Sequence, residues 1–160
     1  MKITSIGLPP TLIIVDKCAY QGCHRLTPSL TLPHTLRIIR MNAFEKCTGI
    51  TSLTLPDKLA RIEANAFARC TGLTGSLHLP HALVHLGSEA FSYCTKLTSL
   101  VIPKGFRYDH RTRNIGSRVF AYCSGLTSVV FEDPACSVSS LDPSGGKLKL
   151  EQVYSTVYII

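Results

Sequence analysis

The chain has 160 residues, of which 45% are hydrophobic and 17% are charged. This balance excludes an intrinsically disordered chain, and the length suits a single folded domain. Seventeen Lys and Arg residues against ten Asp and Glu residues give a net charge of +7. A positive charge of this size favours an acidic protein, a nucleic-acid backbone or an anionic membrane surface as partner over a basic one.

No uninterrupted apolar stretch reaches about 18 residues, so the sequence predicts no membrane-spanning helix. Near the amino terminus, Pro9 and Pro10 interrupt the apolar run, and no convincing cleavage site follows. The lack of a signal peptide favours an intracellular location. A surface or secreted location is expected instead if the amino terminus is truncated.

A short apolar segment recurs along the chain and reads Ser-Leu-Thr-Leu-Pro in its clearest copies. The copies begin at Ser5, Ser29, Ser52, Ser76, Ser99 and, without the proline, Ser128. Apolar and small polar residues alternate with period two, which predicts strands with one buried face. The proline ends each strand because it cannot donate a ladder hydrogen bond. After the proline, pairs of apolar residues are predicted to turn inward: Leu12 and Ile14, Leu36 and Ile38, Leu59 and Ile62, Leu83 and Leu86.

A five-residue motif follows each proline and has an aromatic residue second and cysteine last. Its copies are residues 19–23, 43–47, 66–70, 90–94 and 119–123. Self-similarity with a period in the twenties is typical of a solenoid, in which each coil is stable only against its neighbours. Cysteine follows the aromatic residue by three, which places both on one face of a short helical turn. Both side chains are therefore predicted to line up in the core from coil to coil.

The combined pattern, seen in residues 50–56 followed by 66–70, resembles the leucine-rich repeats of the BspA-like type over about residues 3–133. The resemblance implies an α/β fold, a right-handed solenoid with a parallel sheet on the concave face. Short helical turns or irregular structure are implied for the convex face. It also implies binding of protein or ligand without catalysis, and many members look like surface adhesion modules.

The repeats divide the chain into an array and a tail. Residues 1–133 are predicted to form about five coils plus a final strand, and residues 134–160 a capping tail of the same domain. The first coil has no polar capping unit ahead of it. Residues 1–20 are therefore predicted to meet another subunit, a second copy or an upstream part of a longer chain.

The cysteines and histidines do not indicate a metal site or a cofactor. Five of the seven cysteines recur once per coil without short-spaced pairs, which predicts buried reduced thiols. Cys18 and Cys136 lie outside the pattern, and a redox role stays open for them. His78, His81 and His85 form the tightest histidine group, but Pro80 makes a shared helical face improbable, so solvated histidines are favoured over a metal.

No enzyme signature is present: the sequence has no GxSxG elbow and no glycine-rich phosphate loop followed by lysine. The sequence therefore predicts neither catalytic residues nor a small-molecule substrate. A residue type that recurs in every coil usually serves the stack, whereas catalysis needs a unique place.

The largest departure from the period lies between Pro103 and Val119, where sixteen residues replace the usual ten. Insertions in solenoids map to loops on one face, often the binding face. The predicted contact residues are Lys104, Phe106, Arg107, Tyr108, His110, Arg111 and Arg113. Arginine interleaved with aromatic residues is typical of protein interface hot spots and of single-stranded nucleic-acid contacts. A solvated basic loop without a partner is the alternative.

Together these features predict a non-enzymatic protein-interaction module whose partner has an acidic surface. One alternative is a structural subunit of a multi-protein or RNA-containing assembly, held through the basic loop and the uncapped first coil. A second alternative is a cell-surface adhesion module.

Overall fold

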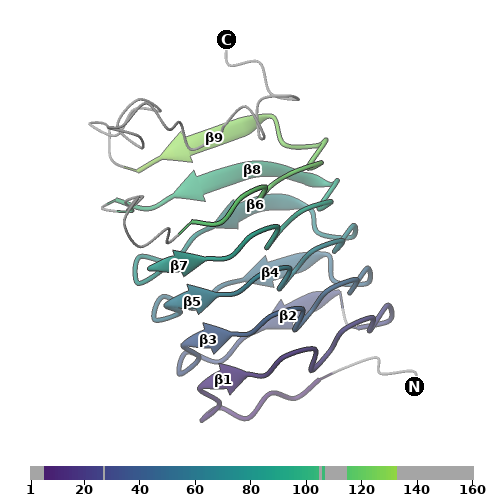
Figure 1. The fold of residues 1–160 in the computed structure, drawn as a ribbon, viewed down its shortest axis with the longest axis vertical. Helices are drawn as coiled ribbons and strands as arrows, with labels where there is room; N and C mark the ends of the chain where they lie inside the picture. Colours follow the sequence, from purple (N-terminus) through teal and green to yellow (C-terminus); the bar gives the residue numbers. More distant parts are fainter. Residues whose placement is uncertain (1–5, 27, 105, 107–114, 133–160) are drawn as a thin grey trace.

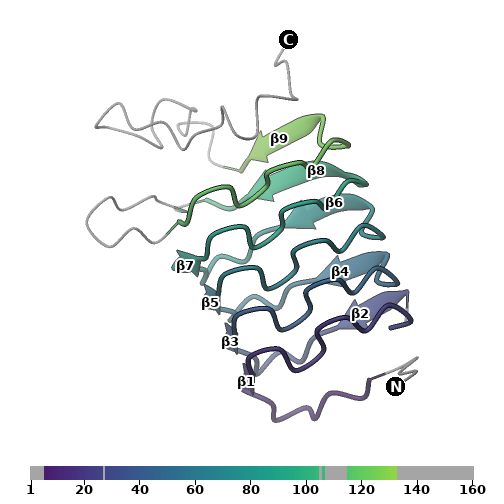
Figure 2. The same cartoon turned by 45° about the vertical axis from the view of Figure 1, so that its right-hand side comes forward.

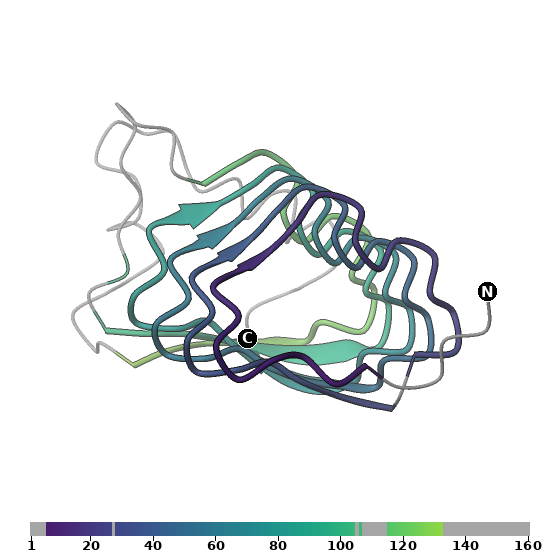
Figure 3. The ribbon, with the colours of Figure 1, turned by 90° about the horizontal axis from the view of Figure 1, so that it is seen from below.

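The structure is a computed structural model that describes residues 6–26, 28–104, 106 and 115–132. Its coils are stacked one above the next in chain order, from residues 6–26 at one end to residues 115–132 at the other (Figure 1). Successive coils superimpose closely when the molecule is seen along the stack (Figure 3). The coils that begin at residues 29, 52 and 75 each pass through a long strand, a short strand and the five-residue motif, so the solenoid has three sides.

The first side carries the long strands, which five of the six repeated segments form as predicted; the described residues 6–9 of the first copy form no strand. They are β2 (Ser29–Thr31), β4 (Ser52–Thr54), β6 (Gly75–His78), β8 (Leu97–Ile102) and β9 (Ser128–Phe131). The strands pair in parallel, in the orders β2-β4 and β6-β8-β9. Ser29 lies opposite Ser52, and Ser99 lies opposite Ser128. Equivalent positions of successive sequence repeats therefore lie opposite each other in the sheet.

The second side carries short strands that the sequence pattern did not reveal. They are β1 (Ile14–Val15), β3 (Ile38–Ile39), β5 (Arg61–Ile62) and β7 (His85–Leu86), and they form one parallel sheet in that order. Figure 2 shows the long strands and the short strands on their two sides of the stack. A parallel bridge from Leu86 to Ile115 carries this side into the next coil.

On this second side, the prediction that Ile14 and Ile38 face the core is wrong. Val15 and Ile39 are buried, whereas Ile14 is 36% exposed and Ile38 is only half-buried. In a two-residue strand one side chain points in and the other points out. The inward side chain stands six residues after the proline in all four coils. The predicted inward residues match this position only at Ile62 and Leu86.

The third side carries the motif, and it contains turns instead of the predicted short helical turns. No helix occurs in the described residues, so the predicted α/β class is corrected there to a β-solenoid of parallel strands. Backbone N–H groups donate to the next coil, as from Phe44 to the Ala66 carbonyl at 2.8 Å and from Phe67 to the Ala90 carbonyl at 2.8 Å. Inter-coil hydrogen bonds take the place of intrahelical ones.

Left-handed backbone at two places in each copy explains why the motif does not become a helix. The residue before the motif and its fourth residue have positive φ, at Cys18, Gly22, Asn42, Lys46, Asn65, Arg69, Glu89, Tyr93, Arg118 and Tyr122. A right-handed helix cannot continue through a residue in this conformation. The chain instead turns so that alternate N–H groups point at the coil above.

The core contains the predicted aromatic file. Tyr20, Phe44, Phe67, Phe91 and Phe120 stack in sequence, with neighbouring ring centroids 5.2 to 5.6 Å apart. The three central rings have no exposed surface. Each ring thus gains buried area and an offset stacking contact with the ring of the next coil. The prediction of an apolar spine is confirmed.

Four of the five motif cysteines are buried thiols, as predicted, and each of the four makes a hydrogen bond between coils. The Cys70 Sγ donates to the Phe44 carbonyl at 3.1 Å, and the Cys94 Sγ donates to the Phe67 carbonyl at 3.3 Å. Cys47 and Cys123 do the same at 3.0 and 3.1 Å. Burial raises the pKa of Cys47 to about 12 and that of Cys123 to about 11. Protonated thiols are required here because only S–H can donate to a carbonyl.

The two remaining cysteines in the described part of the chain are less enclosed. Cys23, in the first motif, and Cys18, before it, are both free and partly buried. Cys136 lies outside the described residues, as does the tail that was predicted to cap the array.

Candidate interaction surfaces

The segment inserted in the fifth coil is held by core residues at both ends. The Phe106 N–H donates to the Pro103 carbonyl at 3.2 Å, just as Leu83 donates to Pro80 at 3.0 Å. Phe106 is only 7% exposed, so it takes the core place that leucine holds three residues after the proline in the other coils. The other end is Ile115, which is also buried and pairs with Leu86.

The predicted contact residues therefore divide into three groups. Phe106 packs in the core, and Lys104 is exposed at the start of the segment. The other five, Arg107, Tyr108, His110, Arg111 and Arg113, lie outside the described residues, and their role stays a prediction. The sequence did carry a signal that Phe106 belongs to the core, because a leucine stands three residues after the proline in each earlier coil.

Cationic side chains gather where the chain passes from the long strands to the short strands. Arg37, Lys58, Arg61 and Lys104 stand on or beside this edge, with Lys58 and Arg61 in the same coil, and we call them the basic corner. Arg37 is anchored there because its guanidinium donates to the Thr35 carbonyl at 2.7 Å. In the part of the chain that the structure describes, none of the four forms an ion pair. Their charge is thus offered to solvent or to a partner.

Exposed apolar side chains flank these cations. Ile13 and Val84 are 57% and 61% exposed. Backbone bonds from Arg37 to the Ile13 carbonyl and from Val84 to the Ala60 carbonyl place them in one row with Arg37, one residue per coil. A row of exposed apolar and cationic side chains is suited to a partner that is both acidic and partly apolar.

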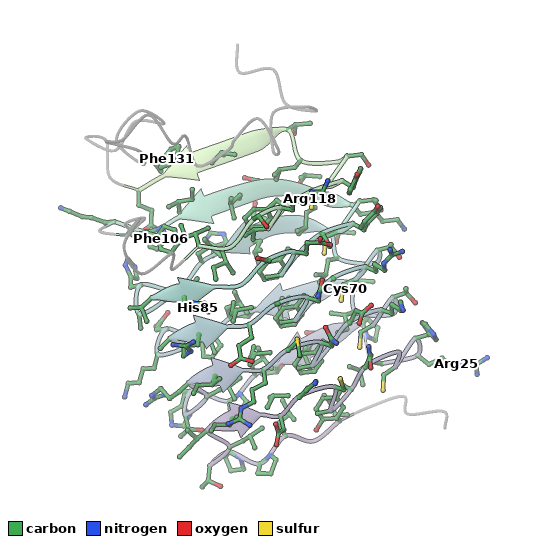
Figure 4. All side chains as sticks on the ribbon, in the orientation of Figure 1. Arg25, Cys70, His85, Phe106, Arg118 and Phe131 are labelled. Carbon is green, nitrogen blue, oxygen red and sulfur yellow. The ribbon has the colours of Figure 1, made fainter. Side chains whose placement is uncertain are left out.

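The three neighbouring histidines do not come together. His78 points outward from β6, and His81 lies 3.7 Å from the Glu132 carboxylate. His85 lies on β7, beside β5; burial, and then the charge of Arg61, lower the pKa of the imidazole. Figure 4 shows His85 and Phe106 on the side of the molecule opposite Arg25 and Cys70. Within the described ranges, no group of three His, Cys, Asp or Glu residues could hold a metal ion.

A second surface lies on the motif side, and the sequence pattern did not predict it. The Arg69 guanidinium carbon lies 4.7 Å from the centre of the Tyr93 ring. Tyr93 stacks in turn on Tyr122, with ring centroids 4.4 Å apart. All three occupy the fourth place of the motif, in successive coils, and we call them the Arg-Tyr stack. The sequence signal for this surface is that the fourth motif residue varies, from Gly22 and Lys46 to arginine and tyrosine.

The family follows from a comparison of the whole array with known proteins. The model of the BspA type leucine rich repeat region matches residues 1–127 in six copies. The chain belongs to this family. Proteins with such leucine-rich repeats bind other proteins, and the family is generally a repeat scaffold without enzymatic activity. No curated protein matches the sequence.

Solved structures of bacterial leucine-rich repeat proteins share the fold. A leucine-rich repeat protein from Bacteroides ovatus is 30% identical, with a TM-score of 0.67, over 79% of this chain and 33% of that one. A T. pallidum leucine-rich repeat protein is 25% identical, with a TM-score of 0.60, over 82% of this chain and 72% of that one. A leucine-rich cell surface protein from Faecalibacterium prausnitzii is 19% identical, with a TM-score of 0.58, over 85% and 41%.

This leucine-rich repeat protein spans about a third of the length of the Bacteroides protein. Its repeat side chains account for the stack of coils, and the family match assigns none of its outer residues to a partner. No membrane-crossing helix occurs in the ranges that the structure describes.

Proposed function

We propose that this leucine-rich repeat protein is a non-enzymatic module that binds an acidic region of another protein. The contact surface is the basic corner together with the inserted segment, whose candidate residues are Lys104, Arg107, Tyr108, His110, Arg111 and Arg113. The observation that carries the proposal is the group of four cations that form no ion pair with any described residue, flanked by exposed Ile13 and Val84.

The physical reason is the balance between attraction and desolvation. An internal ion pair would satisfy each cation and would leave little charge for a partner. Here the carboxylates of the partner supply that pairing, and the flanking apolar side chains lower the exposure of the pairs to water. The stack of coils holds the backbone that carries the cations at fixed spacing, so binding costs little backbone entropy.

Affinity purification of the tagged full-length protein from its own cells tests this function. The double variant Arg37→Glu, Arg61→Glu reverses two charges of the basic corner without touching the core. We expect the recovered amount of the specifically co-purifying protein to fall at least tenfold with this variant. Lys96→Glu is the matched control, because Lys96 is exposed at the opposite edge of the long strands. Equal recovery with both variants would contradict the proposal.

A structural subunit of a larger multi-protein or RNA-containing assembly is the second candidate. The first described coil favours it, because Ile6, Leu8, Leu12 and Tyr20 pack against the core and remain partly exposed. Such a subunit would stay in a complex of fixed composition at high salt. Loss of that complex after ribonuclease treatment would identify RNA as a component.

A cell-surface adhesion module is the third reading, and it predicts a different result. The protein would be recovered from the outer surface of intact cells, by protease shaving or surface labelling. Recovery only from the cell interior would exclude this reading.

A further inference from the structure

The Arg-Tyr stack on the motif side joins one side chain from each of three successive coils. We propose that it is a second docking surface, which binds an acidic α-helix of a partner protein laid along the axis of the solenoid. The proposal uses the proposed function only in taking a protein as the partner. It is otherwise independent of the basic corner, which lies on other sides of the coil.

Coverage of the ring faces decides which chemistry the stack can recognise. Tyr93 carries the Arg69 guanidinium on one face and the Tyr122 ring on the other. A nucleobase or a sugar ring therefore has no free face of Tyr93 on which to stack. The stack presents ring edges, phenol hydroxyls and guanidinium N–H groups instead. Ring edges are electropositive, and the polar groups are donors, so the complementary groups are anionic acceptors such as carboxylates.

The carboxylates nearby in this chain do not neutralise the stack. Glu45 lies 3.3 Å from the Lys46 ammonium and accepts a hydrogen bond from Gln21 at 2.6 Å, so it serves the coils before the stack. Glu89 belongs to the other left-handed row, directly before the motif. Within the described residues, Arg69 has no carboxylate partner. Its charge is held in place by Tyr93 and remains available.

The spacing of the stack favours a helix over an extended peptide. Successive groups are 4.7 and 4.4 Å apart. Side chains on one face of a strand repeat at about 6.7 Å. This repeat is longer than the spacing of the stack, so a strand's side chains would not align with successive groups of the stack. Acidic side chains at alternating third and fourth positions of a helix repeat at about 5.3 Å on average, which flexible Glu and Arg side chains can match over two turns.

The backbone shows that these large side chains are held at a place that suits glycine. Arg69, Tyr93 and Tyr122 have φ of 61°, 59° and 60°, and Gly22 takes the equivalent place in the first coil. Glycine meets this conformation without steric cost, whereas residues with a Cβ do not. Stacking keeps the side chains ordered before a partner arrives, so little entropy is lost on binding.

Substitution by glycine gives a test that spares the fold. The full-length protein is titrated with a fluorescent, Ala-rich helical peptide that carries Glu at alternating third and fourth positions. We expect Arg69→Gly and Tyr93→Gly each to weaken binding at least tenfold, as for interface hot spots. Lys46→Gly is the matched control, with the same backbone place outside the stack, and should change affinity less than twofold. Thermal unfolding confirms that each variant is folded.

Three results would overturn the proposal. The first is equal binding of a peptide of the same composition that is kept extended by prolines. The second is tighter binding of a single-stranded RNA oligonucleotide at the stack. The third is an affinity that the glycine variants leave unchanged but that Arg37→Glu, Arg61→Glu abolishes; this would assign the peptide to the basic corner and would leave the proposed function standing.

Discussion

The inner and outer faces of the five-residue motif differ in how far their residues vary. The inner face repeats almost the same pair in every coil, an aromatic ring and a cysteine, and both are buried from the second coil onward. The outer face changes from Gly22 and Lys46 to arginine and then to two tyrosines. A buried residue is constrained by the identical coil above and below it, whereas an outer residue meets only solvent or a partner. Uniform places therefore report the stack, and variable places report what the protein touches.

Alkaline pH should lower the free energy of unfolding more than any single substitution, because it acts on all the buried thiols of the inner face. The raised pKa values of the four buried thiols mean that the unfolded chain loses their protons above about pH 8.5, while the folded chain keeps them. The folded state thus binds more protons, and its stability falls as the pH rises through this window. Each thiol lowers the free energy of unfolding by about 1.4 kcal/mol per pH unit there.

Urea denaturation at pH 7, 9 and 10 measures this loss. Cys70→Ala removes one of the thiols and should give a shallower dependence on pH, although it is less stable at pH 7. A free energy of unfolding that stays constant from pH 8 to 10 would show that the thiols do not act as buried donors.

Phe67→Ala should break the aromatic file at its centre. Phe67 stacks on both Phe44 and Phe91 and has no exposed surface, so its removal leaves a cavity with rings on two sides. We expect a loss of about 4 kcal/mol in the free energy of unfolding. Phe67→Leu keeps most of the buried area and should lose less than half as much. Equal losses in the two variants would mean that the cavity is not the cause.

Gly72→Ala should separate two coils at their closest approach. A Cβ at Gly72 would lie 2.2 Å from the Thr48 carbonyl oxygen and 2.7 Å from that of Ile50, both backbone atoms of the preceding coil. We expect a loss of about 3 kcal/mol by chemical denaturation, since the backbone must shift. Gly7→Ala is the control, because its Cβ would meet no atom within 4 Å. Similar losses at both positions would point to chain entropy rather than contact.

Arg69→Gly should have the smallest effect on stability, although Arg69 lies in the same motif as Phe67. Relief of the left-handed backbone contributes up to about 1 kcal/mol, and the lost contact with Tyr93 costs about as much. The midpoint of thermal unfolding should stay within about 3 °C of the wild type. A larger decrease would mean that the Arg-Tyr stack serves the fold and not a partner.

Much of the fold could be predicted because one coil is the environment of the next. The period-two strand segments and the spacing of Phe44 to Cys47 are local patterns, and repetition made their register and burial predictable across the array. The candidate surfaces were less predictable. Phe106 was assigned to a contact because its neighbours are basic and aromatic, although its distance from Pro103 places it in the core.

The sequence by itself determined the period, the long parallel strands, and the aromatic and cysteine spine, since these depend on residues close together in the chain. Only the tertiary structure decided that the motif turns through two left-handed residues, that Val15 and Ile39 face inward, and that Arg69, Tyr93 and Tyr122 touch. Local composition favours a helical turn at the motif, and inter-coil hydrogen bonds override that preference. The three stacked side chains are 24 and 29 residues apart, and winding of the chain brings them together.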